Sequence, residues 1–241
     1  MPRTPAPLPA FERPLTGVDL VIFTVRDAHL QVLLTRRPAA PAEPFPHWWA
    51  LPGGFIDIDQ DASLEACARR KLAEKTGLSS PYLEQLGSFG SRSRDPRGWS
   101  ATHVYFALLP DDGREPQAGG YATDARWHPV RDHGVRDKLA FDHTEILAAA
   151  LERLRGKVEY TSLPAFLLPE EFTLTELQQM YEVILDRPIE RSAFRRRVRA
   201  ADLVVEVPRQ REGSNRPAQL YRLKDRRQPV FFPRTFSPRG E

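Results

Sequence analysis

The sequence of 241 residues predicts an α+β protein built of two unequal units. Through residues 15–157, strand-like runs rich in Val, Ile and Leu alternate with two helical patterns. Residues 171–226 then offer two more helices followed by a pair of strands. The composition, with 41% hydrophobic and 28% charged residues, is ordinary for a globular protein whose units bury their own cores.

The remaining segments are expected to bound or join these units. Residues 1–14 contain five prolines and are expected to form a flexible arm. Residues 158–170 contain two prolines and no clean period, which predicts a linker. Residues 227–241 are expected to be an extended tail, although Phe231, Phe232 and Phe236 are able to dock on the protein.

Composition also bears on the compartment. No uninterrupted apolar run reaches membrane-spanning length, and the N-terminus has no apolar stretch typical of a signal peptide. The single cysteine, Cys67, excludes an internal disulfide and a zinc site made of several thiolates. We therefore expect a cytoplasmic protein with no membrane partner.

Five main strands and two helices are predicted in the first unit. Residues 17–25 and 29–37 form a hairpin around the polar tip RDA, and further strands are expected at 83–90, 100–109 and 126–130. The helices are expected at 63–76 and 141–157. In the second of them, apolar residues recur at 146, 147, 150, 151 and 154, which gives one apolar face.

The first of these helices carries an unusual pair of charges. Ser63 is placed to begin it and Gly77 to end it. At about 100° per residue, Lys71 and Lys75 lie roughly 20° either side of Leu64, so both should face the body of the protein. Such lysines either extend from the edge of a core to solvent or hold an anion between them, because two inward ammonium groups repel each other and resist desolvation. Arg70 and Glu74, also four residues apart, are expected to pair on the flank.

The segment GGFIDIDQDASLEACARRKLAEKTGL, residues 53–78, resembles a Nudix box. That pattern is Gly, five residues, Glu, seven residues, and then Arg-Glu-apolar-x-Glu-Glu-x-Gly-apolar. The matching positions are Gly54, Arg70, Leu72, Glu74, Gly77 and Leu78. The spacing between Gly54 and Arg70 is two residues longer than the pattern, and Gln60 or its neighbours stand in place of the early glutamate. Most importantly, Lys71 and Lys75 replace the two helix glutamates.

This resemblance implies a changed chemistry. In Nudix hydrolases the glutamates hold a divalent metal, which neutralises a diphosphate and activates a water. A charged lysine cannot ligate a metal, so we expect no metal, no cofactor and no catalytic residue, with a diphosphate held directly by Lys71 and Lys75. The alternative is a Mg²⁺-dependent hydrolase of ADP-ribose or nucleotide sugars with an accessory nucleic-acid-binding domain. Its metal ligands would come from Glu65, Glu74, Asp57, Asp59 and Asp61.

Two further segments are expected to contribute to the ligand pocket. The loop SRSRDPRGW carries Arg92, Arg94 and Arg97, which are candidates for phosphate or ribose contacts, although arginines in a loop are most often solvated. In LAFDHTEIL, residues Phe141, Asp142 and His143 lie where a helix begins and where free backbone N–H groups favour an anion. Asp142 is also placed to cap that helix. The predicted ligand site thus comprises Arg70, Lys71, Glu74, Lys75, Arg92, Arg94, Arg97, Phe141, Asp142 and His143.

The second unit is basic and has the order of a winged helix-turn-helix. Residues 170–241 hold 15 Lys+Arg against 11 Asp+Glu, whereas residues 1–169 hold 20 against 21. A capping-box pattern at Thr173 and Glu176 starts one helix, DRPI makes a turn, SAFRRRVRAAD makes a second helix, and a hairpin with a basic tip follows. A charge run is usually a solvated face, but this one precedes a basic wing. The DNA-binding candidates are Ser192, Arg195, Arg196, Arg197, Arg199, Arg211 and Arg216.

The combination of both units is similar to NrtR-type transcriptional regulators of NAD metabolism, and the similarity runs from about residue 15 to 225. It implies a Nudix-like α/β/α sandwich with a mixed sheet, followed by a small winged helix. It further implies that the first unit binds ADP-ribose or a related nucleotide as effector. The second unit is then expected to bind a double-stranded DNA operator as part of a homodimer, with repression relieved by the ligand.

Overall fold

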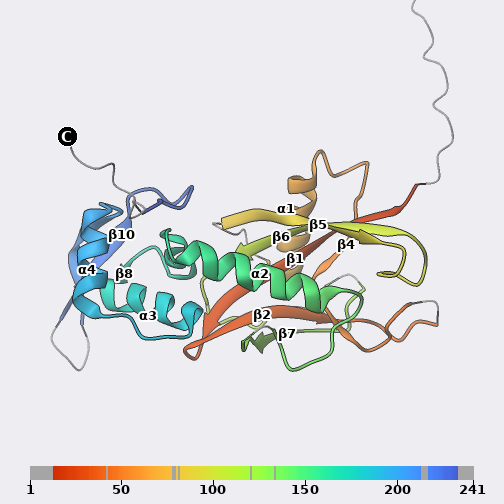
Figure 1. Cartoon of the computed structure of the whole chain (residues 1–241), viewed down its shortest axis with the longest axis horizontal. Coiled ribbons are helices and arrows are strands. Elements are labelled where there is room, and N and C mark those ends of the chain that lie inside the picture. The colour runs from red at the N-terminus through yellow and green to blue at the C-terminus, as the bar shows by residue number, and fades with distance from the viewer. Residues whose placement is uncertain are drawn as a thin grey trace, which may run out of the picture.

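The computed structural model describes residues 13–41, 43–77, 80, 82–119, 121–132, 134–212 and 217–232. Two units lie at opposite ends of an elongated molecule, and helix α2 (His143–Val158) runs from the first toward the second (Figure 1). None of the described helices has the length and apolar character needed to cross a membrane.

The first unit is organised around one seven-stranded sheet. Its strands are β1 (Leu15–Arg26), β2 (His29–Arg36), β3 (Trp49–Ala50), β4 (Gly53–Phe55), β5 (Tyr82–Ser91), β6 (Ser100–Leu108) and β7 (Asp124–Pro129). The main path is β3-β2-β1-β6-β5, with β4 added to β1 and β7 added to β2. Among the strand pairs of the described residues, β1–β6 is parallel and the others are antiparallel. The prediction of a mixed sheet is therefore confirmed, and every predicted strand is present.

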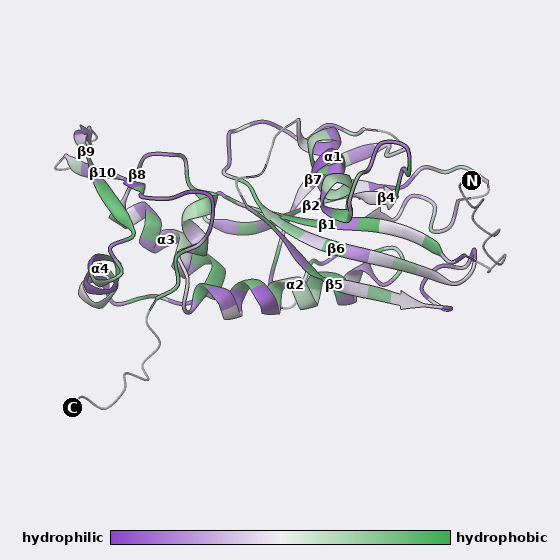
Figure 2. Ribbon diagram, turned by 90° about the horizontal axis from the view of Figure 1, so that it is seen from above, coloured by the Kyte–Doolittle hydropathy of each residue, from purple (hydrophilic) through white to green (hydrophobic). Residues whose placement is uncertain are grey.

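Alternating side chains of β1 fill two different cores. Val21 and Phe23 belong to the core under α2, whereas Leu20 and Ile22 belong to the core under α1 (Leu64–Thr76). Since successive residues of a strand point to opposite faces, one strand can hold both helices in place. Figure 2 shows the sheet between α1 and α2, which is the predicted sandwich.

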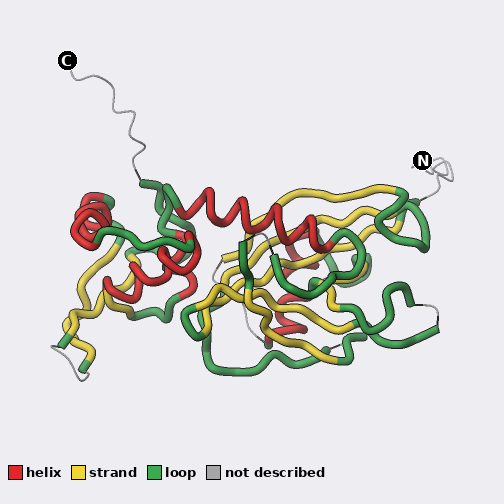
Figure 3. The backbone as a smooth tube through the Cα atoms, turned by 60° about the horizontal axis from the view of Figure 1, so that its bottom comes forward, coloured by secondary structure: helices red, strands yellow, loops and turns green. Residues whose placement is uncertain are grey.

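The second unit has the predicted helix, helix and hairpin order. Its elements are β8 (Phe172–Thr173), α3 (Leu174–Leu185), α4 (Arg191–Ala200), β9 (Val204–Arg211) and β10 (Ala218–Leu223), and Figure 3 shows them gathered at one end of the molecule. The capping box is confirmed, because Glu176 N donates to Thr173 Oγ1 at 3.1 Å and Thr173 N donates to Glu176 Oε2 at 2.7 Å. The sequence did not predict β8, which pairs with β10 and is only two residues long.

Most of the expected linker, residues 161–168, is buried. Residues Leu163–Leu167 form a 3-10 helix, η1, in which all five side chains are buried. One continuous hydrophobic core includes Phe106 of the sheet, Phe166 of η1 and Phe194 of α4. The segment 158–170 therefore joins the two units through shared packing. Its apolar side chains would be exposed to water in a free connector, and packing them into the core removes that surface from water.

The start of the expected tail also packs against this region. Ser162 N donates to Val230 O at 2.9 Å, and Phe232 N donates to Tyr160 O at 2.8 Å. Phe232 is only 4% exposed, whereas Phe231 is 65% exposed. Phe232 is thus buried against the protein and Phe231 stacks on the Tyr160 ring, with ring centres 6.1 Å apart, while Phe236 lies outside the described residues.

Candidate functional site

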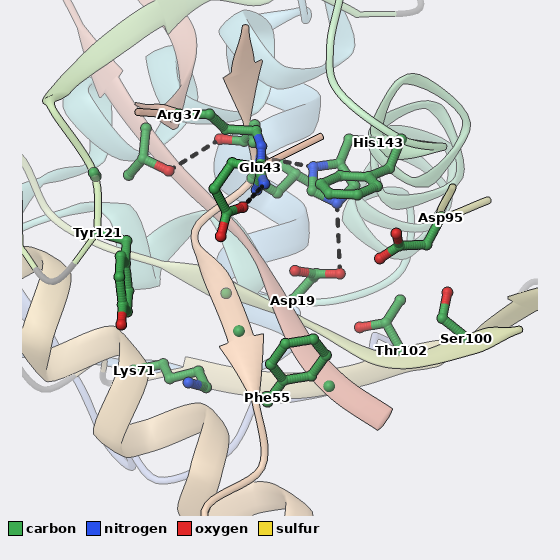
Figure 4. Close-up of a pocket in the computed structure, with 18 of the residues that line it drawn as sticks. Asp19, Arg37, Glu43, Phe55, Lys71, Asp95, Ser100, Thr102, Tyr121 and His143 are labelled. Carbon is green, nitrogen blue, oxygen red and sulfur yellow. Dashed lines mark hydrogen bonds and ion pairs between the residues drawn. The ribbon is translucent and has the colours of Figure 1, made fainter. Parts of the chain in front are cut away.

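A cavity of about 530 Å³ opens where α1, β4, the starts of β1 and β6, and the N-terminus of α2 meet (Figure 4). Seven of the ten predicted ligand-site residues line it: Lys71, Glu74, Lys75, Arg94, Arg97, Phe141 and His143. Arg70, Arg92 and Asp142 do not. Segments far apart in the chain thus converge on one site.

The lysine pair faces the cavity, as the helical spacing predicts. Lys71 is 7% exposed and Lys75 is 8% exposed, and both line the cavity. Lys71 lies so close to Gly54 that a Cβ built there would stand 3.1 Å from Nζ, and Gly54 has a φ of +146° that favours glycine. Lys75 Nζ donates to Gly119 O. Burial is the main cause that lowers the pKa of Lys75, and the nearby positive charge of Lys71 lowers it further.

Arg70 has a structural partner on either side. It donates to Asp61 at 2.8 and 2.7 Å and to Glu74 at 2.7 Å, so its predicted pairing with Glu74 is confirmed. The hydrogen bonds from Arg70 hold the pKa of Asp61 well below its ordinary value. These contacts keep Arg70 on the flank of α1 and out of the cavity wall.

The three loop arginines have different surroundings. Arg94 makes a two-pronged ion pair with Asp142, with both N–O distances 2.9 Å. Arg97 pairs with Asp95 at 2.8 Å, and its guanidinium lies 5.4 Å from the ring centre of Phe55. Arg92 is exposed. The loop therefore supplies two cations to the cavity wall.

The start of α2 differs from the expectation in one respect. Asp142 occupies the N-cap position, but its side chain makes no capping hydrogen bond. Its carboxylate instead accepts two hydrogen bonds from the charged guanidinium of Arg94. These bonds are stronger than the bond that a neutral backbone N–H at the helix end would donate. The interpretation of Asp142 as a capping side chain is therefore wrong.

The geometry around His143 fixes its tautomer. Leu51 N, which can only donate, lies 2.9 Å from His143 Nδ1. The proton of the neutral ring is then on Nε2, which lies 3.5 Å from Asp19 Oδ2. Burial opposes ionisation of Asp19, yet its contacts with His143, Thr102 and Arg94 lower its pKa below the ordinary value. His143 thus presents a donor to a buried carboxylate.

The sequence analysis missed several residues of the cavity wall. They include Asp19, Arg37, Glu43, Thr102 and Tyr121. Arg37 pairs with Glu43 at 2.5 Å and lies 4.7 Å from the ring centre of Phe141. Only Asp19 left a signal in the sequence, because a carboxylate within the apolar run of β1 needs a partner or a function.

The acidic residues near α1 do not fit a magnesium site. Within the described ranges, no group of three or more His, Cys, Asp or Glu side chains is arranged to hold a metal ion. Asp61 and Glu74 both bind Arg70, and Asp57 accepts a hydrogen bond from Gln60 at 2.6 Å. Lys71 and Lys75, which face the cavity from α1, cannot ligate a metal while charged.

Helix α4 presents most of its predicted DNA-binding residues outward. Phe194 and Val198 are buried, as predicted. Ser192, Arg196 and Arg199 are exposed, and Arg195 is half-buried. The Ser192 hydroxyl donates to Glu190 Oε1, and Glu190 caps the helix through two backbone N–H groups. The outward face is therefore rich in arginine and free of acidic residues between Arg191 and Arg199.

The other DNA-binding candidates have different environments. Arg197 lies on the opposite side of the buried stripe, donates to Glu159 O, and stands 4.6 Å from the ring centre of Phe232. Arg211 of β9 pairs with Glu176 at the start of α3. Arg216 lies outside the described residues. Arg197 and Arg211 are thus engaged with the protein itself.

Arg197 borders a second cavity of about 250 Å³. The wall combines the end of α2, helices α3 and α4, and Phe232. Across the same junction, Arg155 of α2 donates to Ile184 O of α3 at 3.1 Å, and Tyr181 of α3 donates to Thr161 O at 2.7 Å. Helix α3 thus contacts α2 and the 158–170 segment through one hydrogen bond each, and α4 contacts the residue after α2 through Arg197.

Comparison with known proteins assigns both units. A family model described as NUDIX domain matches residues 15–150, and one described as NrtR DNA-binding winged helix domain matches residues 164–223. The ADPR responsive transcriptional repressor NtrR of Acinetobacter baylyi is 45% identical over 224 residues, which cover 93% of this chain and 88% of that protein. The ADP-ribose pyrophosphatase of Methanocaldococcus jannaschii is 33% identical over 134 residues, 56% of this chain and 71% of that protein.

Solved structures of one relative match as well. Shewanella oneidensis NrtR in complex with a 27mer DNA superimposes with a TM-score of 0.79 and 43% identity, covering 90% of this chain and 97% of that chain. The Nudix domain of the same protein in complex with ADP ribose matches with a TM-score of 0.54 and 45% identity, covering 60% of this chain and 90% of that one.

Proposed function

Because the chain belongs to the NrtR family, we propose that it is a DNA-binding transcriptional repressor whose Nudix domain binds ADP-ribose, or a closely related nucleotide, as effector. The observation that carries this proposal is the pair of buried lysines in the cavity. We expect the protein to act in the cytoplasm, on an operator that controls NAD-related genes.

The lysine pair favours binding over hydrolysis. Two buried ammonium groups bind a diphosphate by direct charge pairing, and Arg97 adds a third cation to the wall. Hydrolysis by a Nudix enzyme needs a metal to activate water, and three carboxylates beside α1, those of Asp57, Asp61 and Glu74, are already bound to Gln60 or Arg70. The site is therefore suited to hold the ligand intact.

DNA binding is assigned to the outward face of α4. Arg195, Arg196 and Arg199, with Ser192, can enter a major groove and contact guanine edges or phosphates. A single winged helix reads a short half-site, so we expect two copies of the chain to bind a two-fold operator. Arg216, which follows β9 and precedes β10 in the sequence, is expected to contact the flanking minor groove.

Regulation requires that the effector bind the DNA-free arrangement more tightly than the DNA-bound one. Helix α2 is the element best placed to connect the two events. His143 at its first residue lines the cavity, and the carbonyl of Glu159, just beyond its end, accepts a hydrogen bond from Arg197 of α4. A small displacement of α2 on ligand binding therefore bears directly on the recognition helix.

The enzymatic alternative is tested by two measurements on the same protein. We expect calorimetry to detect ADP-ribose binding without Mg²⁺, and product analysis to find no AMP or ribose phosphate with Mg²⁺. Steady Mg²⁺-dependent turnover contradicts the non-catalytic assignment and favours the hydrolase alternative. The ADP-ribose pyrophosphatase relative is an enzyme of that kind.

The DNA-binding assignment has its own test. Replacing both Arg195 and Arg199 by Ala should weaken operator binding at least tenfold and reduce the slope of log K against log salt by about 2. Arg153→Ala, which removes one arginine from α2 in the first unit, is the matched control and should leave both quantities unchanged. An unaltered gel shift for the double variant removes α4 from the interface.

A further inference from the structure

Two arginines of strand β9 are held by acidic residues at the start of the second unit. Arg209 donates to the carboxylate of Glu171, the residue just before β8. Arg211 donates to the carboxylate of Glu176 and, at 3.3 Å, to the backbone oxygen of Glu171. Figure 2 shows β8, β9 and β10 together at one end of the molecule. The end of β9 is therefore tied to the residues that lead into α3.

These ion pairs lie in water and can open at little cost. The side chains of Arg209 and Arg211 are 68% and 45% exposed. Exposed ion pairs contribute little to folding, because each partner is well solvated when the two separate. Glu176 also keeps its second role when Arg211 leaves, since its Oε2 accepts from Thr173 N at 2.7 Å and completes the cap of α3. Opening the pairs thus leaves the winged unit folded.

The hairpin of β9 and β10, which we call the wing, lies next to the proposed DNA-binding face of α4. Burial and the charge of Glu206 raise the pKa of Tyr221 in β10, and the positive charges of Arg199 and Arg195 of α4 oppose this shift. The wing is therefore within electrostatic reach of those arginines. DNA bound to α4 brings phosphates to the same region, and a phosphate pairs with a guanidinium group as a carboxylate does.

We propose that Glu171 and Glu176 are internal competitors of DNA: they hold Arg209 and Arg211 in the free protein, and phosphates replace them in the complex. This inference rests on the proposed function, because it assumes that the winged unit binds duplex DNA. It adds an autoinhibitory contact that opposes each phosphate contact of the wing. Phosphate contacts carry no sequence information, so the competition lowers the affinity for operator and random duplex alike.

The test is Glu171→Gln, which removes the charge and keeps the shape of the side chain. Fluorescence anisotropy of the full chain is measured on a duplex that the wild type selects from a random pool, and on a random-sequence duplex of equal length. Both affinities should rise about two- to fivefold. The slope of log K against log salt should steepen by up to about 1, because Arg209 then meets the phosphate as a free cation.

Two further variants separate competition from a general effect of charge. Glu212→Gln removes the same charge from an exposed side chain at the end of β9, and it should raise affinity less. In an Arg209→Gln background, Glu171→Gln should no longer raise affinity, because the arginine that it releases is absent. A gain that persists in that background, or an equal gain from Glu212→Gln, overturns the proposal.

Unchanged affinity of a folded Glu171→Gln variant also overturns the competition, while leaving the proposed function intact. If this variant does not fold, Glu176→Gln applies the same test to Arg211, because a glutamine at this position still caps the helix. Failure of the wild-type protein to select or bind any duplex overturns the proposed function, and the competition with it.

Discussion

Removing the charge of Lys71 tests the role of the cavity most directly. Lys71→Met keeps a long unbranched side chain of similar bulk while deleting one of the two buried ammonium groups. A hydrogen bond to a charged group is worth about 1.5–3 kcal/mol, so affinity for ADP-ribose should fall by about 10- to 150-fold. The double variant with Lys75→Met should lose more than either single change.

The affinity for ADP-ribose should depend on pH differently in the wild type and in Lys71→Met. Burial and the charge of Lys71 lower the pKa of Lys75 from 10.5. A lysine holds a diphosphate only while protonated, so wild-type affinity should fall as pH rises through the lowered pKa of Lys75. In Lys71→Met the repulsion is gone and the pKa of Lys75 rises, so the remaining affinity should persist to higher pH.

The same shift affects stability, with a definite sign. The folded state binds the Lys75 proton less tightly than the unfolded state does. Stability without ligand should therefore rise as pH increases from the folded-state pKa of Lys75 toward 10.5, and this contribution should be smaller in Lys71→Met. Chemical denaturation at several pH values measures it.

The assay is calorimetric titration with ADP-ribose at constant ionic strength, since charge pairing is screened by salt. Lys224→Met is the matched control, because it deletes one ammonium group that pairs with Asp202 in the winged unit. Equal ADP-ribose affinity for Lys71→Met and wild type refutes the claim that the lysines hold the diphosphate.

Two further predictions concern the residues that join the cavity to the rest of the protein. Arg94→Gln leaves the carboxylates of Asp19 and Asp142 without their guanidinium partner. It should therefore lower the free energy of unfolding by about 3–5 kcal/mol and weaken ADP-ribose binding. A denaturation curve that overlays that of the wild type contradicts the predicted loss of stability. Arg197→Met removes the hydrogen bond to Glu159 O and the contact with Phe232. It should therefore shrink the difference between the operator affinities measured with and without ADP-ribose, while the affinity for ADP-ribose in the absence of DNA stays within about twofold of the wild type. An unchanged difference in operator affinity excludes Arg197 from the coupling.

Local periodicity was enough to predict the parts of the site that lie on single helices. The positions of Lys71 and Lys75 on the inner face of α1 follow from helical geometry, and so do the buried positions of Phe194 and Val198 in α4. Arg197 stands on the far side of the same buried stripe, but its contact with Phe232 depends on where the chain returns after β10. No local pattern encodes that return.

Other site residues depend on long-range pairing. Asp19 and Thr102 become neighbours because β1 and β6 pair in parallel, which brings together segments more than 80 residues apart. The sequence predicts each strand but not their register. Asp142 shows a second limit, since its position allows a helix cap, whereas its actual partner, Arg94, comes from a distant loop. Competition between local and distant partners is settled only by the packed structure.

The energy available at the junction is sufficient for the proposed regulation. Helix α2 has 16 residues and therefore spans about 24 Å, from His143 in the cavity wall to the contacts with α3 and α4. Its buried face is packed in the common core, so it can shift only as a unit. A tenfold change in operator affinity needs about 1.4 kcal/mol. The hydrogen bond of Arg197 to Glu159 O contributes about 0.5–1.5 kcal/mol, and its contact with the Phe232 ring contributes about 0.5–1 kcal/mol. Together these two contacts contribute about 1–2.5 kcal/mol, a range that includes the 1.4 kcal/mol of a tenfold change, so breaking or making them as α2 moves supplies coupling of the size that allosteric proteins commonly show.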